Sequence, residues 1–193
     1  MNPYRHIMDL PDCEGTSTQE QIRSTLLDLL ERKPLSEISV KELCADAFVA
    51  RSTFYYYYQN TDEVLGEIEN GIIYHLARQN SEIMDRSVTK PEDMLFYHET
   101  IQYVQDNRKV FYLFLIGQPN YRFIEKWKQA VKYHLWERLF CQRVAKNEGL
   151  ILEMAASLVI SAYTYCLKNP YDVDWSEICE MVSRILQMLD YES

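Results

Sequence analysis

Glycine and proline are scarce in this sequence, which has 5 Gly and 6 Pro among 193 residues. So few of them exclude collagen-like and linker-rich chains, and they argue against an all-β fold, which needs many turns. The hydrophobic share of 47% can supply a buried core. The length fits one large domain, or a small domain joined to a larger one.

Cysteines are few and widely spaced: there are 5, an odd number, and none forms a C-x-x-C pair. We expect reduced thiols that pack as small hydrophobes, with no disulfide, metal site or cofactor. No apolar leader is expected, because Arg5, Asp9 and Asp12 interrupt the N-terminal segment. The most apolar stretch, residues 155–167, is too short to span a bilayer. The sequence therefore predicts a cytoplasmic protein with no membrane partner.

Positively charged residues are also few: the chain has 20 Lys and Arg against 29 Asp and Glu, which gives a net charge of −9. Residues 1–60 alone contain 6 Lys and Arg against 9 Asp and Glu. An acidic chain is not an obvious nucleic-acid binder, because the phosphate backbone attracts basic surfaces. Any DNA-binding surface here is expected to be a small local patch with a modest salt dependence.

Apolar residues recur at spacings of three and four along most of the chain, which predicts an all-α protein of about nine helices. Capping boxes at Ser17-x-x-Glu20 and Ser39-x-x-Glu42 predict two helix starts, and Asn60 with Glu63 predicts the start of a long helix. Residues 1–15, with prolines and a glycine, are expected to form a flexible arm, and residues 81–90 a connector. Further helices are expected over about 89–107, 108–116, 121–144, 148–168 and 174–191.

Two short helices separated by a tight turn are expected within residues 39–58, which read SVKELCADAFVARSTFYYYY. This arrangement is typical of a helix-turn-helix, whose second helix places its first residues against base edges in the major groove. The small core that would hold the two helices consists of Val40, Leu43, Ala47, Val49, Phe54 and Tyr58. The side chains left facing outward are Arg51, Ser52, Thr53, Tyr56 and Tyr57.

These residues resemble the TetR family of bacterial transcriptional regulators over about residues 18–70. The matching positions are Ile22, Leu26 and Leu30, then Ile38–Val40, Ala47-x-Val49, Arg51–Tyr55 and Thr61–Leu65. The resemblance implies an all-α homodimer with an N-terminal three-helix DNA-binding head and a C-terminal helical bundle for ligand binding and dimerisation. On that basis the domains are residues 16–76, including the motif at 39–58, and residues 77–193.

The resemblance also implies roles for individual residues of the head. Ser39 and Lys41 would contact phosphate at the start of the first motif helix, and Tyr55 would hydrogen-bond a phosphate. Base or backbone contacts would come from Arg51, Ser52, Thr53, Tyr56 and Tyr57. Arg51 is the best candidate for reading a base directly, because a guanidinium pairs with guanine O6 and N7.

Three positions depart from the family pattern. Phe48 stands where the family usually has glycine in the turn, and Ala50 stands where a Ser or Thr usually caps the second motif helix. Thr61 replaces a lysine aimed at phosphate. Two functions therefore stay open: a regulator, usually a repressor, that binds a palindromic operator, or a TetR-like ligand- or protein-binding dimer that has lost operator binding.

The C-terminal half offers a candidate effector site and a candidate dimer interface. Residues 150–167 are apolar almost all round, so they need cover on all sides, which predicts a homodimer through about residues 148–168 and 175–191. No nucleophile elbow, phosphate loop or paired carboxylate is recognisable, so no catalytic residue and no enzyme activity are expected. The aromatic residues that could line a pocket for a small-molecule effector, or simply form core, are Tyr97, Tyr103, Phe111, Phe114, Trp127, Tyr133 and Tyr163.

Overall fold

The computed structural model describes residues 1–86, 95–139 and 147–188, which contain nine α-helices and no strand. This confirms the all-α prediction. In chain order the helices are α1 (Ser17–Leu30), α2 (Val40–Asp46), α3 (Arg51–Tyr57), α4 (Thr61–Arg86), α5 (Leu95–Asp106), α6 (Arg108–Tyr112), α7 (Tyr121–Leu139), α8 (Glu148–Lys168) and α9 (Trp175–Met188). A π-helical segment, Leu113–Gly117, continues α6, and the short 3-10 helices are Arg5–Asp9 and Leu35–Glu37.

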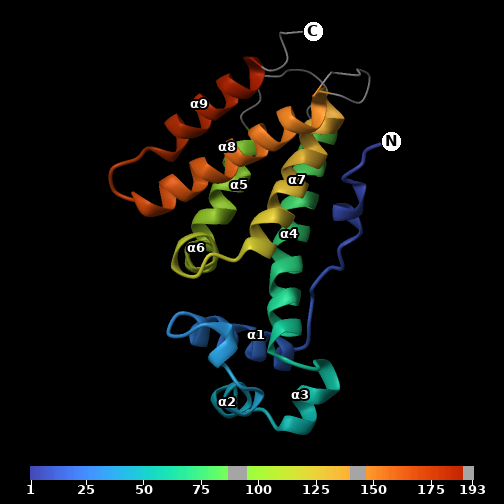
Figure 1. The fold of residues 1–193 in the computed structure, drawn as a ribbon, viewed down its shortest axis with the longest axis vertical. Helices are drawn as coiled ribbons and strands as arrows, with labels where there is room; N and C mark the ends of the chain where they lie inside the picture. Colours follow the sequence, from blue (N-terminus) through green and yellow to red (C-terminus); the bar gives the residue numbers. More distant parts are fainter. Residues whose placement is uncertain (87–94, 140–146, 189–193) are drawn as a thin grey trace.

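The helices form two groups that share α4 (Figure 1). Helices α1, α2 and α3 lie around the first turns of α4, and we call this group the head. Helices α5 and α7 pack against the rest of α4, and α6, α8 and α9 pack on them in turn; we call this group of five helices the body. Because α4 is a single helix of 26 residues, it connects the two groups as one rigid rod.

Capping side chains set where the head helices begin. Ser39 accepts a hydrogen bond from the Glu42 amide (3.2 Å), and Asn60 accepts one from the Glu63 amide (2.9 Å). Both caps begin helices where the sequence predicted, although the Glu42 side chain pairs with Lys33 and does not complete the capping box. The capping box of α1 lies one residue earlier than predicted, because Thr16 and Gln19 form it in place of Ser17 and Glu20.

The middle of the chain differs from the prediction in its helix boundaries. Helix α4 continues to Arg86, so the first part of the expected connector at 81–90 is helical. Residues 87–94, which include the expected start of the 89–107 helix, lie outside the described residues, as does the end of the expected 121–144 helix. The expected 108–116 helix is present as α6 and its π-helical continuation, and it ends at Gly117.

The N-terminal segment is not the flexible arm that its prolines and glycine predict. The Asn2 side chain donates hydrogen bonds to the Tyr133 carbonyl (3.0 Å) and the Glu137 carboxylate (2.9 Å), both on α7. Ile7 is buried in the 3-10 helix, which packs against α4 and α7. At the other end of the segment, Arg23 of α1 donates to the Cys13 carbonyl (2.7 Å). Residues 1–15 thus run alongside α4 from body to head (Figure 1).

A cluster of aromatic side chains forms the core of the body. Trp127 of α7 lies 5.1 Å from Phe111 and 5.3 Å from Tyr163, measured between ring centroids. Phe123 packs edge-on against Phe111 and Phe114. Tilted and edge-to-face pairs are favourable aromatic geometries, and each is worth roughly 0.5–1.5 kcal/mol beyond area burial. This cluster holds α6, α7 and α8 together.

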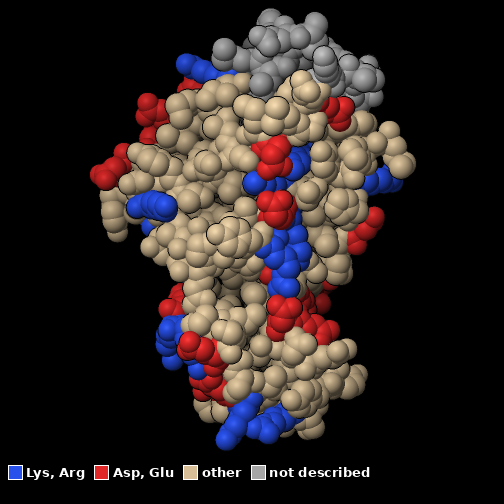
Figure 2. All heavy atoms as spheres, in the orientation of Figure 1, with Lys and Arg blue, Asp and Glu red and all other residues tan. Residues whose placement is uncertain are grey.

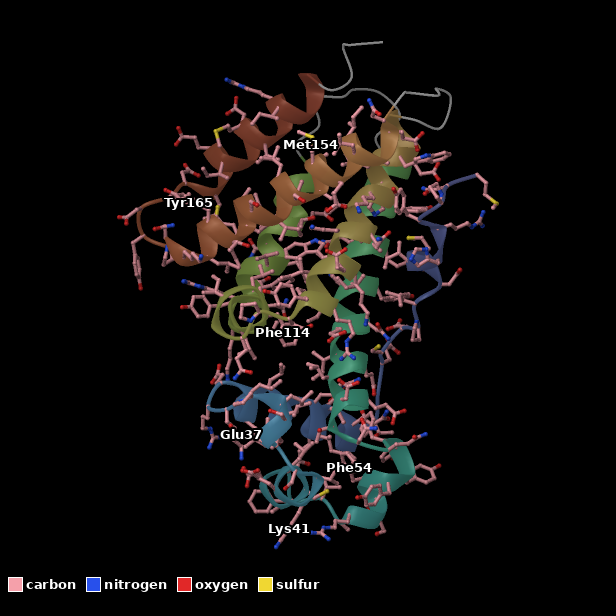
Figure 3. The ribbon with its side chains drawn as sticks, viewed as in Figure 1. Glu37, Lys41, Phe54, Phe114, Met154 and Tyr165 are labelled. Atoms are coloured by element: carbon pink, nitrogen blue, oxygen red, sulfur yellow. The ribbon has the colours of Figure 1, made fainter. Side chains whose placement is uncertain are left out.

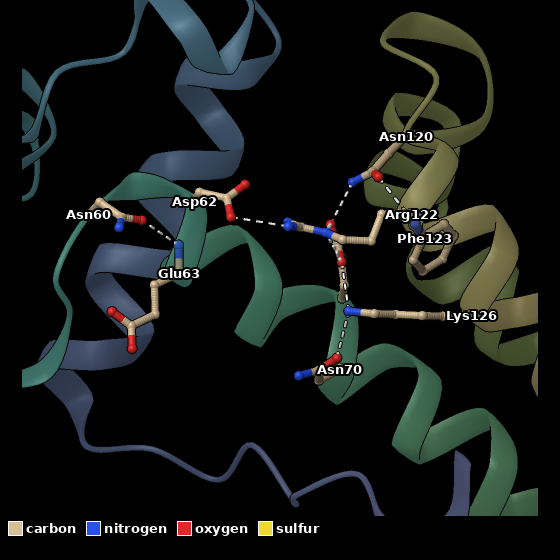
Figure 4. Close-up of polar contacts among 9 residues, drawn as sticks. Asn60, Asp62, Glu63, Asn70, Asn120, Arg122, Phe123 and Lys126 are labelled. Atoms are coloured by element: carbon tan, nitrogen blue, oxygen red, sulfur yellow. Dashed lines mark hydrogen bonds and ion pairs between the residues drawn. The ribbon is translucent and has the colours of Figure 1, made fainter. Parts of the chain in front are cut away.

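A buried carboxylate joins α4 to α7. Glu69 of α4 is 0% exposed, and Arg122 donates to both of its carboxylate oxygens (2.9 and 2.8 Å). Lys126 and Asn120 complete the shell, each at 2.8 Å. Arg122 also reaches Asp62 in the first turn of α4, at 3.0 Å (Figure 4). The start of α7 is therefore tied to two places on α4, one of them where α4 joins the head.

We expect Glu69→Gln to destabilise the fold by roughly 3 kcal/mol, because it leaves two cations beside a neutral buried group. Chemical denaturation of the purified protein measures this directly. Asp28→Asn is the matched control, since the Asp28–Lys109 pair is exposed and should contribute less than about 1 kcal/mol. Equal effects of the two variants would contradict a structural role for the buried network.

A second prediction concerns pH. His134 is 4% exposed, and burial lowers its pKa to about 4, against the smaller opposing effect of a hydrogen bond with the Ala77 backbone. The unfolded chain takes up this proton near pH 6.5, whereas the folded chain does so only near pH 4. Stability is therefore fully present above about pH 6.5 and falls by roughly 2–3 kcal/mol as the pH drops to about 4.

The His134→Gln variant isolates this contribution, because it cannot take up the proton. Denaturation of both proteins between pH 4 and pH 7 should show a gap that changes with pH, with the wild type losing more stability on acidification. Parallel curves would show that His134 is not the group responsible.

Candidate nucleic-acid interface

The helix-turn-helix motif is held by a compact core. Phe54 of α3 is fully buried in one hydrophobic cluster with Leu43 of α2 and Ala47, the residue that follows α2, and residues of α1 and α4 belong to the same cluster. Tyr58, directly after α3, is also buried, and Val40 and Val49 are half-buried against the same core. All six residues predicted for this core therefore lie in it. The packing fixes α3 relative to α2 without using the outward-facing side chains.

The turn between α2 and α3 is a Schellman motif. The Val49 amide donates to the Cys44 carbonyl (2.9 Å), and the Phe48 amide donates to the Ala45 carbonyl (3.2 Å). These two bonds close the end of α2 and need the intervening residue to adopt a left-handed backbone conformation. Phe48 occupies that position with φ of 51°. Glycine adopts it freely, whereas a residue with a Cβ loses roughly 1–2 kcal/mol.

The N-terminus of α3 has no side-chain cap. Ala50 has the extended backbone of a capping residue, with φ of −64° and ψ of 143°, but it has no oxygen to accept an amide hydrogen bond. The free amide groups at this end of α3 carry a partial positive charge. Because no capping side chain accepts their hydrogen bonds, these amide groups remain available to an external acceptor.

The side chains predicted to contact DNA differ in exposure. Arg51, Ser52, Tyr55 and Tyr56 are exposed, with Tyr56 82% exposed. Tyr57, predicted to face outward, is half-buried against the head core. Tyr57 lies three residues after Phe54, so it shares part of the buried face of this short helix. Of the remaining candidates, Ser39 and Lys41 are exposed, whereas Thr53 and Thr61 are half-buried.

The exposed cations of the motif lie at the tip of the head. Figure 2 shows lysine and arginine side chains at the lower tip, where Figure 3 places Lys41. Among the described residues neither Lys41 nor Arg51 has an ion-pair partner, whereas Lys33 is held by Glu42 at 2.6 Å. The motif thus carries two cations without an ion-pair partner among the described residues, together with two exposed tyrosines, Tyr55 and Tyr56. That a small patch of this kind binds DNA stays a prediction.

The candidate effector residues lie mainly in the core. Phe111, Phe114, Trp127 and Tyr163 belong to the aromatic cluster of the body, and the space beside Tyr163, between α8 and α9, is about 10 Å³. Tyr133 is half-buried, and the side chain of Tyr97 lies outside the described part of the chain. Their role as a ligand site stays a prediction.

Two of the candidate residues border larger surface grooves. Phe114 lines a groove of about 660 Å³ at the waist between head and body, together with Leu30, Asp62 and Arg122. Tyr103 lines another of about 640 Å³ beside the N-terminal segment, where its ring stacks on His75 at 4.0 Å and burial raises its pKa to about 12. Within the described ranges, no three His, Cys, Asp or Glu side chains gather in a way that could hold a metal ion.

Known proteins share this architecture. No family model matches the chain. A protein of Haemophilus influenzae described as an uncharacterized HTH-type transcriptional regulator is 28% identical over 154 residues, which cover 75% of this chain and 76% of that protein. A TetR transcriptional regulator from Streptococcus agalactiae has a TM-score of 0.67 at 20% identity, with 94% of this chain and 96% of that chain covered. The fatty acid degradation regulator FadR of Bacillus halodurans gives 0.64 at 14%, covering 90% and 96%.

The chain therefore has a TetR-like fold, as the motif residues predicted, because the solved structures it resembles are TetR-type regulators. These similar structures are described as regulators: two TetR-type transcriptional regulators and one regulator of fatty acid degradation.

The missing cap generates a prediction for this site. Ala50→Ser should stabilise the protein by about 1 kcal/mol, because the backbone already has capping geometry and the hydroxyl can accept an α3 amide. Thermal or chemical denaturation measures the gain. Ala45→Ser is the matched control, since Ala45 is exposed within α2 and serine there slightly weakens the helix. A loss of stability in Ala50→Ser would contradict the cap assignment.

Proposed function

We propose that this protein is a cytoplasmic DNA-binding transcriptional regulator, acting as a repressor. In this proposal residues 16–76 bind a palindromic operator, and residues 77–193 dimerise and respond to a small-molecule effector. The observation that carries it is the first turn of α3, where exposed Arg51 and Ser52 stand on a rigid, fully packed helix-turn-helix. The TetR-like fold supports the same function.

Direct reading of a base is assigned to Arg51. Its guanidinium lies at the first position of α3, the end that enters the major groove in this motif. Lys41 in the first turn of α2 is assigned to phosphate. Ser39 already caps α2 with its side chain, so any phosphate contact from Ser39 has to use its remaining hydrogen-bonding capacity. Tyr55, Tyr56, Ser52 and Thr53 supply the other contacts.

These assignments predict different outcomes for two variants. Arg51→Ala should lose about 1–3 kcal/mol of operator binding and relax base preference at one position. Lys41→Ala should weaken binding about equally on all sequences and reduce the salt slope by about 1. Titration of operator and mutated operators at several salt concentrations measures both. A uniform loss in Arg51→Ala would show that Arg51 contacts phosphate only.

The proposed dimer uses the exposed apolar side chains of α8 and α9. Met154 is 64% exposed, and Leu150 and Tyr165 on the same helix are also exposed, while Met181 and Ile185 of α9 add to them. By length and composition α8 could even cross a membrane, although much of it is buried against neighbouring helices. A second copy packed on α8 and α9 would cover these side chains. Figure 3 shows Met154 and Tyr165 on the same helix.

Sedimentation at micromolar concentration tests the dimer. The wild type should sediment as a dimer, and Met154→Glu should shift it toward the 23.0 kDa monomer by burying an unpaired charge in the interface. Tyr171→Ser is the matched control, because Tyr171 is exposed but belongs to the loop that connects α8 to α9 and to neither helix. A wild-type species of 23.0 kDa would rule the dimer out.

A second candidate function is a ligand- or protein-binding dimer whose head no longer binds DNA. The uncapped α3, the strained turn at Phe48 and the acidic head favour it. Mixing the protein with DNA at low salt separates the two functions, because electrostatic binding is strongest there. Absence of any complex under that condition would favour the second function.

A further inference from the structure

Phe48 is the most exposed aromatic side chain of the head. It is 90% exposed, and among the described residues only Met1 and Tyr171 exceed it as large exposed hydrophobics. Both of those lie far along the chain from the motif. The phenyl ring of Phe48 is therefore left in solvent by the rest of the described chain, directly between the two helices of the motif.

Within the described residues, no packing favours a phenylalanine at this position, because its side chain is 90% exposed. The turn needs a positive φ, which Phe48 adopts at a cost that glycine would not incur. The hydrogen bonds of the turn use only backbone groups, so glycine would make the same bonds. A strained backbone that bears an exposed apolar ring is typical of a site where the side chain has a function outside the chain.

The position of Phe48 next to α3 indicates which kind of molecule its ring would contact. Phe48 precedes Arg51 by three residues, so their Cα atoms are at most about 11 Å apart. When the first turn of α3 enters the major groove, a residue within about 11 Å of Arg51 also comes close to that groove. Apolar groups are available there, because thymine presents a methyl group and deoxyribose presents C–H groups.

We propose that Phe48 is a further DNA-contacting residue, whose ring packs on the apolar groups of the groove wall, the thymine methyl or the deoxyribose. This inference rests on the proposed function. It agrees with the charge of the head, since residues 1–60 contain 6 Lys and Arg against 9 Asp and Glu and must gain affinity from uncharged contacts. The rings of Tyr55 and Tyr56 on α3 are exposed as well and can add further uncharged contacts.

Phe48→Gly tests the proposal, because stability and binding should change in opposite directions. Glycine relieves the strain at φ of 51°, so the Tm should rise by about 2–4 °C. Affinity for the operator should fall by about tenfold for each half-site. The slope of affinity against salt should stay unchanged, because no cation is removed. Phe48→Tyr keeps the ring and should bind as the wild type does.

A control and a modified operator sharpen the result. Tyr171→Gly removes an equally exposed ring outside the head and should leave affinity unchanged. Replacing operator thymines by uracil removes only their methyl groups. If uracil lowers the operator affinity of the wild type but not that of Phe48→Gly, the ring contacts a thymine methyl. If uracil changes the affinity of neither protein and Phe48→Gly still binds more weakly than the wild type, the ring contacts deoxyribose. Both results support the proposal.

Two outcomes overturn it. If the wild type binds its operator and Phe48→Gly binds equally well, Phe48 makes no contact and the proposed function stands alone. If the wild type binds no DNA even at low salt, the proposed function fails together with this contact. Comparison of wild type and variant on the same DNA distinguishes the two cases.

Discussion

The buried carboxylate of Glu69 is the interaction on which the arrangement of head and body depends. A carboxylate at 0% exposure needs cations and donors around it, and here Arg122 and Lys126 come from the start of α7 and Asn120 directly precedes it. This requirement fixes α7 against α4. Arg122 extends the connection to Asp62 at the first turn of α4, next to the helix-turn-helix.

A second contact reinforces the same connection. The Gln118 side chain, just before α7, donates to the Leu30 carbonyl at the end of α1, at 2.5 Å. Head and body are thus joined by α4 itself, by the Arg122–Asp62 pair and by this hydrogen bond, around the groove at the waist (Figure 2). In the proposed function, an effector changes operator affinity only if it binds differently to two arrangements of these contacts.

Local sequence signals predicted much of the head. The spacing of apolar residues identified the helix-turn-helix core, and the caps at Ser39 and Asn60 identified two helix starts. Tyr57 shows the limit of such reasoning, because spacing alone does not decide whether a residue at the edge of the buried face of a short helix is buried or exposed. The resemblance had already indicated Phe48 as unusual, but its positive φ and its exposure came from the structure.

Contacts between distant residues could not be predicted. Asn2 holds the N-terminal segment in place by donating a hydrogen bond to Tyr133 of α7, more than a hundred residues away along the chain. The 3-10 helix of this segment has five residues, which is too short to show a periodic pattern of apolar residues. The partners of Glu69 likewise lie on another helix, so the sequence shows only an acidic residue within an amphipathic helix. Aromatic residues at helical spacing also give the same sequence pattern whether they line a pocket or fill a core. Here Trp127 and its neighbours fill the core.

The most direct test of the central claim is selection of genomic fragments by the purified protein at a stated, moderate salt concentration. The account predicts enrichment of one palindrome with half-sites about one DNA turn apart, roughly 34–36 Å between the two recognition helices. Its position beside a gene would then identify what is regulated. Failure to enrich any sequence, repeated at low salt, would contradict operator binding and favour the dimer whose head has lost it.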